Sequence, residues 1–242
     1  MSEPLPGAPC DDAKGRDVRG IIFDLDDTIY PRAQFVHSGF NAVASYVAAS
    51  WRRERDAVLA ALVSGRDRGR EGQEFQLLCE ECRLPLSLIP ALVAVFRGHS
   101  PAIALDPSVR CTLERLRRDG WRLVVLTNGD PDVQRRKVAA LGLEPLVHGV
   151  VYAEEHAPDG KPDPAAFSVA LNQLRVAPSR CLCVGDDLQR DIEGARRAGL
   201  RSIRVDSQHA RPRAERDADA VIDSIVRVPA IAASLLEGNH AA

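Results

Sequence analysis

Residues 19–28 read Arg-Gly-Ile-Ile-Phe-Asp-Leu-Asp-Asp-Thr, and this stretch decides the fold class of the chain. Its apolar run, Ile21 to Phe23, has the character of a short strand that is buried in a sheet. Three acidic residues, Asp24, Asp26 and Asp27, follow the run at once. We therefore expect a buried strand that leads directly into a polar, acidic loop.

Downstream of residue 100, short apolar runs alternate with amphipathic segments that end at glycines. The expected strands are residues 121–126, 149–152, 181–184, 201–205 and 220–222. The expected helices are residues 108–119, 131–141, 164–174, 191–198 and 228–236. Strands that alternate with helices in this way predict a parallel sheet covered by helices on both faces. The fold class is therefore α/β, with a doubly wound, Rossmann-like core.

The segment between the first strand and residue 100 has a different character, because it contains no β-rich run. Helical spacing of apolar residues is found at 34–51, 56–63, 75–83 and 88–96, and the polar, glycine-rich stretch 64–72 is expected to be a loop. We expect an all-helical cap inserted into the core. The predicted organisation is a leader at 1–18, a core at 19–31 and 101–242, and a cap at 32–100.

The composition excludes several classes of protein. Of the 242 residues, 45% are hydrophobic and 27% are charged, which is ordinary for a globular chain, and the formal net charge is −2. This balance offers no basic field for nucleic acid or an anionic membrane. No apolar run approaches the roughly 18–20 residues of a membrane span, and the first twenty residues lack an apolar signal region. We expect no nucleic-acid or membrane partner and a cytoplasmic location.

The six cysteines do not suggest a disulfide framework in a chain of this length. Cys79 and Cys82 form a C-x-x-C pair, but a zinc site needs further ligands and no second such pair exists. We interpret this pair as packing residues on one helix face. Cys181 and Cys183 alternate along a predicted strand and should therefore point to the same buried side.

Polar clusters follow the expected strands at their carboxyl ends, which is where ligands bind in parallel sheets. Three of them, Asp24–Thr28, Thr127–Asp130 and Gly185–Asp191, come directly after strands, and Gly160–Asp163 follows a fourth strand after a short loop. All four clusters should meet at one edge of the sheet.

The residue types in these clusters suit phosphoryl transfer. If Asp24, Asp26 and Asp186 converge, their charges repel unless a hard cation such as Mg²⁺ binds between them. Lys161 supplies a positive charge for a phosphoryl group, and Thr127 and the loop amides after it supply donors. A carboxylate nucleophile that forms an aspartyl-phosphate and a second carboxyl that serves as acid and then base are established chemistry.

Four motifs together resemble those of the haloacid dehalogenase-like hydrolase superfamily. They are F-D-L-D-D-T at 23–28, L-T-N-G at 126–129, G-K-P-D-P at 160–164 and V-G-D-D-L-Q-R-D at 184–191. The long helical segment between the first two resembles the phosphatase branch with a helical, C1-type cap. The resemblance covers the chain from about Arg19 onward.

The resemblance implies roles for the acidic residues. It makes Asp24 the nucleophile and a metal ligand, and Asp26 the acid and base, with its backbone carbonyl on the Mg²⁺. Asp186 is then a metal ligand and Asp191 supports the waters of the metal, a role that Asp187 is also a candidate to share.

The resemblance also implies how the phosphate is held. The transferring phosphoryl group is expected to be bound by Thr127, Asn128 and Lys161. Lys161 is also expected to be a catalytic residue.

The superfamily is mixed in its chemistry, and individual residues of this chain distinguish between its reactions. Its dehalogenases lack the second aspartate of D-x-D, so Asp26 favours phosphoryl transfer. Its phosphonate-cleaving members use a cap lysine, and residues 31–100 contain none. The leading prediction is an Mg²⁺-dependent hydrolase of a small phosphorylated metabolite. A phosphomutase, a protein phosphatase and a non-catalytic binding or regulatory protein remain alternatives, although a binding protein has no need of Asp26.

Choice of substrate should lie in the cap, which closes over such sites. Arg32, His37 and Arg97 are the candidates for contacts with an anionic or hydroxylated leaving group. The sequence predicts neither the natural substrate nor the oligomeric state.

Overall fold

The computed structural model describes residues 18–67, 69, 71–206 and 218–237, so residues 1–17 of the predicted leader lie outside it. Its centre is a six-stranded sheet in the order β3-β2-β1-β4-β5-β6, with every neighbouring pair parallel. The strands are β1 (Arg19–Phe23), β2 (Trp121–Thr127), β3 (Gly149–Tyr152), β4 (Cys181–Gly185), β5 (Arg201–Val205) and β6 (Ala220–Ile222). The predicted α/β fold with a parallel sheet is confirmed.

Strand β1 lies in the middle of the sheet and is buried on both faces. Ile21 pairs in register with Leu123 of β2 and Leu182 of β4. Ile21 packs into the apolar cluster on one face, whereas Ile22 packs into the cluster on the other. A strand with two buried faces has to be apolar at consecutive positions, which explains the uninterrupted run in the sequence.

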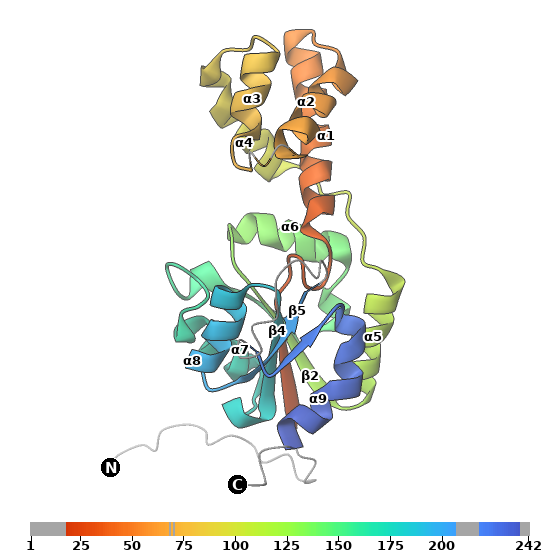
Figure 1. Cartoon of the computed structure of the whole chain (residues 1–242), viewed down its shortest axis with the longest axis vertical. Helices are drawn as coiled ribbons and strands as arrows, with labels where there is room; N and C mark the ends of the chain where they lie inside the picture. Colours follow the sequence, from red (N-terminus) through yellow and green to blue (C-terminus); the bar gives the residue numbers. More distant parts are fainter. Residues whose placement is uncertain (1–17, 68, 70, 207–217, 238–242) are drawn as a thin grey trace, which may run out of the picture.

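Helices cover both faces of the sheet (Figure 1). On one face lie α5 (Pro107–Arg118), α6 (Pro131–Leu141) and α9 (Val228–Glu237), and on the other lie α7 (Pro164–Leu174) and α8 (Gly194–Arg197). The side chains of Asp130 and Asp163 accept hydrogen bonds from backbone N–H groups in the first turns of α6 and α7. Both helices also have a proline at their first position, which favours the start of a helix.

The helical insert consists of α1 (Arg32–Trp51), α2 (Arg55–Asp67), α3 (Glu74–Glu81) and α4 (Ile89–Gly98). It stands beyond one end of the sheet in Figure 1. The insert has an apolar cluster of its own, which includes Phe40, Val43, Leu62, Leu78 and Leu92. The fold therefore contains the all-helical cap that the sequence predicts, whereas the division of the chain at residues 31 and 101 stays a prediction.

Helix α2 extends further than predicted, because it continues to Asp67, into the stretch expected to be a loop. Arg66 forms an ion pair with Glu74 of α3 at 3.5 Å, and buried Gly65 allows Leu77 of the same helix to approach closely. These contacts with a neighbouring helix stabilise an extra turn that the local sequence does not favour.

Cys79, Cys82, Cys181 and Cys183 lie where packing residues are expected. Cys79 is buried in the apolar cluster of the insert, and Cys82 is partly buried at the end of α3. Cys181 and Cys183 of β4 are both buried in the cluster on the α7–α8 face, as their alternation predicts.

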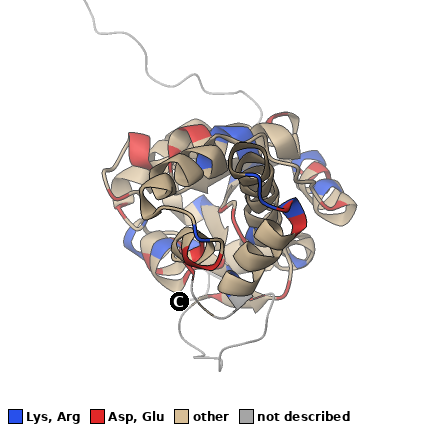
Figure 2. Ribbon diagram, turned by 90° about the horizontal axis from the view of Figure 1, so that it is seen from above, with Lys and Arg blue, Asp and Glu red and all other residues tan. Residues whose placement is uncertain are grey.

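The remaining helical elements are short. They are the 3₁₀ turns Leu86–Leu88, Glu144–Leu146, Ala153–Glu155, Pro178–Arg180 and Ile225–Arg227, and the π-helical turn Leu188–Glu193. Within the part of the chain that the structure describes, no helix combines the length and the apolar character that a membrane-spanning segment needs. Seen from above, basic and acidic residues are interspersed around the molecule (Figure 2).

Candidate active site

A cavity of about 620 Å³ opens at the carboxyl ends of the central strands. It is lined by Asp24 after β1, Thr127 at the end of β2, Lys161 in the loop after β3 and Asp186 after β4. Arg32, at the start of α1, lines it from the side of the insert. The four polar clusters that are separate in the sequence therefore meet in one place, as parallel strand ends require.

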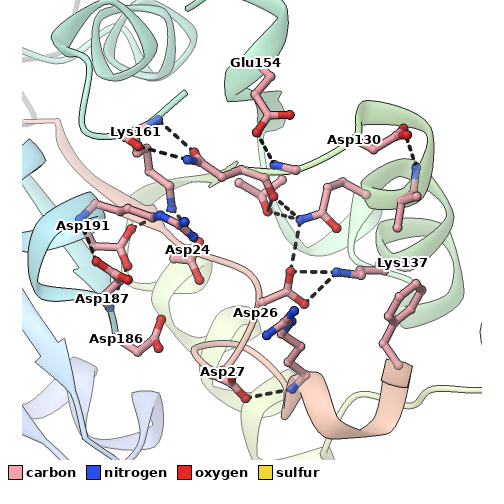
Figure 3. Close-up of a pocket in the computed structure, with 18 of the residues that line it drawn as sticks. Asp24, Asp26, Asp27, Asp130, Lys137, Glu154, Lys161, Asp186, Asp187 and Asp191 are labelled. Carbon is pink, nitrogen blue, oxygen red and sulfur yellow. Dashed lines mark hydrogen bonds and ion pairs between the residues drawn. The ribbon is translucent and has the colours of Figure 1, made fainter. Parts of the chain in front are cut away.

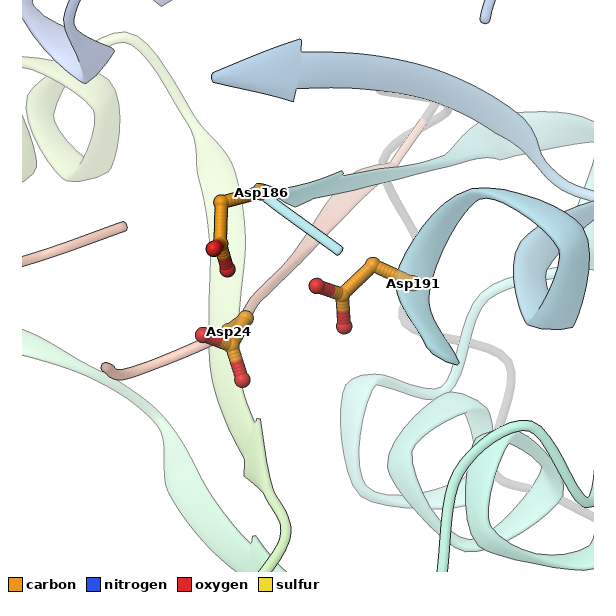
Figure 4. A group of neighbouring side chains, drawn as sticks. All are labelled: Asp24, Asp186 and Asp191. Carbon is orange, nitrogen blue, oxygen red and sulfur yellow. The ribbon is translucent and has the colours of Figure 1, made fainter. Parts of the chain in front are cut away.

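Three carboxylates, those of Asp24, Asp186 and Asp191, converge in this cavity (Figure 4). One oxygen from each lies within 4.8 Å of the others. Burial raises the pKa of Asp24 to about 8, with Lys161 opposing the rise and Asp191 adding to it. Burial and Asp191 also raise the pKa of Asp186, to about 6. The protein thus concentrates negative charge where ionisation is unfavourable.

Lys161 is the positive charge inside this cluster. Its Nζ lies 2.5 Å from Oδ1 of Asp24 and 2.6 Å from Oδ1 of Asp191, and the residue is only 3% exposed. Burial alone would lower the pKa of Lys161, but Asp191 and Asp24 raise it above the ordinary value, so the ammonium stays charged. One ammonium balances one of three carboxylates. The remaining charge and the oxygen donors fit a divalent cation such as Mg²⁺.

A π-helical turn carries Asp191 into the cluster. The N–H groups of Asp191 and Ile192 both donate to the carbonyl of Asp187, at 3.0 and 3.2 Å. The turn begins at Leu188 and continues into α8 at Gly194, so the helix predicted over 191–198 is present but starts three residues earlier and is π-helical in its first part. Its start is displaced because the Asp187 carboxylate accepts hydrogen bonds from the next backbone N–H groups, at Gln189 and Arg190.

Gly185 leaves space for Asp191, and we expect Gly185→Ala to damage both the site and the fold. An added Cβ would lie 2.3 Å from Cγ and 2.5 Å from Cβ of Asp191, which cannot retreat without breaking its ion pair with Lys161. Overpacking of this kind costs about 1–3 kcal/mol. Thermal unfolding should show a lower melting temperature. Gly98→Ala, at an exposed position with nothing within 4 Å of an added Cβ and no positive φ, is the control for the general effect of replacing a glycine.

Asn128 joins the two loops that are expected to hold phosphate. Its Nδ2 donates to the Lys161 carbonyl at 3.0 Å, and its Oδ1 accepts from the Lys161 N–H at 2.9 Å. Gly160 has a φ of 62° and lies so close that a Cβ would sit 2.8 Å from the Asn128 side chain. The side chain of Asn128 is therefore occupied, which leaves its backbone N–H for the predicted phosphate contact.

Asp26 does not join the acidic cluster with its side chain, so the expected convergence of its carboxylate with Asp24 and Asp186 is wrong. Its two oxygens accept from Nζ of Lys137 at 2.7 and 2.9 Å (Figure 3). They also accept from the hydroxyl of Tyr30 at 2.6 Å and from Nε2 of Gln134 at 3.1 Å. Burial alone would raise the pKa of Asp26, but these three donors, Lys137 foremost, lower it below the ordinary value.

Sequence reasoning missed Gln134 and Lys137, although a signal was present. Together with Val138 and Leu141 they occupy positions i, i+3, i+4 and i+7 of α6, which is the spacing of an inward-facing stripe. All four are buried. Two polar residues on such a stripe indicate buried polar partners.

The substrate candidates of the insert divide into two groups. Arg32 and Arg97 line the cavity, and Arg32 also forms an ion pair with Glu71 at 3.0 Å. His37 is not among the described residues that line the cavity. It is exposed on another side of α1, where it borders a separate hollow with His99. Helix α1 therefore directs His37 away from the cavity, where the predicted contact with substrate would be made.

Comparisons with known proteins place this chain among hydrolases. The family model of haloacid dehalogenase-like hydrolases matches residues 18–199. A glyceraldehyde 3-phosphate phosphatase of Methanopyrus kandleri is 32% identical over 203 residues, which cover 78% of this chain and 84% of the relative. A phosphoserine phosphatase of Thermus thermophilus is 35% identical over 178 residues, which cover 73% of this chain and 68% of the relative.

Among solved structures, a 2-haloacid dehalogenase of Pseudomonas syringae has a TM-score of 0.63 and 27% identity. The alignment covers 90% of this chain and 99% of the dehalogenase. The fold is thus shared by proteins whose names describe different reactions.

Proposed function

Because this chain belongs to the haloacid dehalogenase-like hydrolase family, we propose that it hydrolyses small phosphomonoesters through an aspartyl-phosphate on Asp24, with Mg²⁺ bound beside it. The observation that carries the proposal is the ion pair of Asp24 with buried Lys161 inside a cluster of carboxylates. The relatives named as phosphatases of glyceraldehyde 3-phosphate and phosphoserine support a small phosphorylated metabolite as the substrate.

The first step forms a bond between a carboxylate oxygen of Asp24 and phosphorus, while the bond from phosphorus to the ester oxygen breaks. Lys161 orients the carboxylate and offsets phosphate charge, and Thr127 and the N–H of Asn128 hold phosphoryl oxygens. Asp24, Asp186 and the Asp26 carbonyl, with support from Asp191, would hold Mg²⁺, which would supply further charge neutralisation. The leaving oxygen takes a proton from Asp26.

The second step frees Asp24. Water attacks phosphorus, Asp26 accepts a proton from that water, and inorganic phosphate leaves. The lowered pKa of Asp26 favours its ionised form, which this step needs. The free protein therefore has Asp26 in the form that acts as a base. The first step needs Asp26 to hold a proton, so Asp26 has to gain that proton when the ester binds.

The test is the rate of phosphate release from an aryl and an alkyl phosphate. The unaltered protein should hydrolyse both in Mg²⁺. Asp26→Ala should slow the alkyl ester by about a hundredfold or more, within the range that general acid–base catalysis contributes. The aryl ester should lose less, because its leaving oxygen needs less protonation. An equal loss on both esters would mean that Asp26 mainly holds the loop in place. No release by the unaltered protein from a panel of sugar phosphates and phosphorylated acids would overturn the proposed function itself.

The dehalogenase likeness does not favour dehalogenation here, because the second aspartate of D-x-D is present as Asp26. A phosphomutase would use the same residues and return the phosphoryl group to an intermediate. Product analysis separates the two, since only the hydrolase releases inorganic phosphate in proportion to substrate consumed. The cytoplasmic location remains a prediction.

A further inference from the structure

We propose that Lys137 is a positioning residue that fixes the Asp26 carboxylate beside the predicted phosphate-binding loop (Thr127 and Asn128) and links it to the helical insert. The inference rests on the proposed function, because it concerns the acid and base of that reaction. Lys137 lies on α6, outside the four motifs, and lines the cavity.

The burial of Lys137 indicates that its charge serves a specific partner. The residue is 4% exposed, and a buried ammonium is unfavourable unless it is paired. Both oxygens of Asp26 lie within 2.9 Å of its Nζ. Because Lys137 is buried and contacts both oxygens, it restricts the rotation of the short Asp26 side chain.

Gln134, one helical turn before Lys137, sets the distance between Asp26 and the phosphate-binding loop. Its Nε2 lies 3.1 Å from Oδ2 of Asp26 and 2.7 Å from Oγ1 of Thr127. Asp26, the proposed acid and base, and Thr127, which is predicted to bind phosphate, therefore contact the same amide nitrogen. Because Gln134 and Lys137 share a rigid helix, α6 positions Asp26 relative to the phosphoryl group.

The insert contributes the other contacts. Nζ of Lys137 lies 4.5 Å from the ring centre of Phe35, in the first turns of α1, and Phe35 packs edge-on against Phe96 of α4. Tyr30, which donates to Asp26, is two residues before α1. The groups around Asp26 thus include the chain that leads into α1, and α4 is reached indirectly through Phe35, so movement of the insert changes the environment of the Asp26 carboxylate.

The experiment compares Lys137→Met with Asp26→Asn and with the double variant, using an alkyl and an aryl phosphate. Lys137→Met should lower kcat on the alkyl ester by about tenfold to a hundredfold, less than removal of the acid itself. The aryl ester should lose less, and KM should stay within about twofold. In the Asp26→Asn background, Lys137→Met should cause no further loss, because its effect acts through Asp26.

Two further variants guard against a purely structural effect. Arg135→Met removes a charge from the exposed side of the same helix and should leave kcat within about twofold. Tyr30→Phe removes one hydrogen bond to Asp26 and leaves both charges, so it should fold even if Lys137→Met does not. It should show a smaller loss with the same preference for the alkyl ester.

Additive losses in the double variant, or a raised KM with unchanged kcat, would overturn the inference, because Lys137 would then act on the substrate directly. Equal losses on both esters for Lys137→Met and Tyr30→Phe would also overturn it. These outcomes leave the proposed function intact, since that function fails only if the unaltered protein releases no phosphate.

Discussion

Asp24→Asn should abolish phosphate release while the protein stays folded. The amide keeps the shape of the carboxylate but cannot attack phosphorus, and loss of a nucleophile lowers kcat by roughly a thousandfold or more. The fold should survive because burial opposes ionisation of Asp24, and Lys161 keeps its ion pair with Asp191. Phosphate release and thermal unfolding measure the two effects separately.

Acid quenching offers a direct check of the intermediate. The unaltered protein mixed with substrate should carry one phosphoryl group, visible as a mass increase that Asp24→Asn lacks. Asp132→Asn, on the exposed surface of α6, is the matched control and should retain both activity and labelling. Retention of more than a few per cent of the activity by Asp24→Asn would remove Asp24 from the role of nucleophile.

Removal of divalent cations should stop turnover just as completely, and Mg²⁺ should restore it. Three converging carboxylates are matched by one ammonium, that of Lys161, so the site lacks the charge needed to accept a phosphate dianion. We expect Mn²⁺ or Co²⁺ to replace Mg²⁺ in part. Ca²⁺ should inhibit, because its larger and looser coordination displaces the attacking carboxylate.

The measurement is phosphate release after dialysis against EDTA, followed by addition of each cation. EDTA saturated with Mg²⁺ beforehand is the control for inhibition by the chelator. Calorimetry adds a reading that does not depend on activity, because Mg²⁺ should bind the unaltered protein and bind Asp186→Asn far more weakly. Full activity after exhaustive chelation would contradict the interpretation of Asp24, Asp186 and Asp191 as a metal site.

The sequence was sufficient to predict the elements that have strong local signals. The predicted bounds of α6 and α7 agree with the structure because an aspartate and a proline begin each helix, and Gly142 ends the first. The π-helical turn at Leu188 was not predictable in the same way. It arises because the Asp187 side chain and the close approach of Asp191 to Gly185 outweigh ordinary helix formation.

The candidate site was also predictable only in part. Parallel strand ends bring Asp24, Lys161 and Asp186 together whatever the details of packing, so topology alone predicted their meeting. The partner of Asp26 depends on how α6 is rotated against the sheet. That rotation places Lys137 inward, and it is decided by packing across the whole helix instead of by residues near either motif.

The central place of β1 also has a consequence for how the chain is made. Its partners β2 and β4 begin at Trp121 and Cys181, so the strand is synthesised long before either of them. At about 5–20 residues per second, the ribosome needs on the order of ten seconds to reach β4. Meanwhile the residues that form the separate apolar cluster of the insert have all been synthesised. We expect the nascent chain to acquire a structured insert while Ile21, Ile22 and Phe23 still await partners, which makes this apolar segment the part most exposed to aggregation before the core closes.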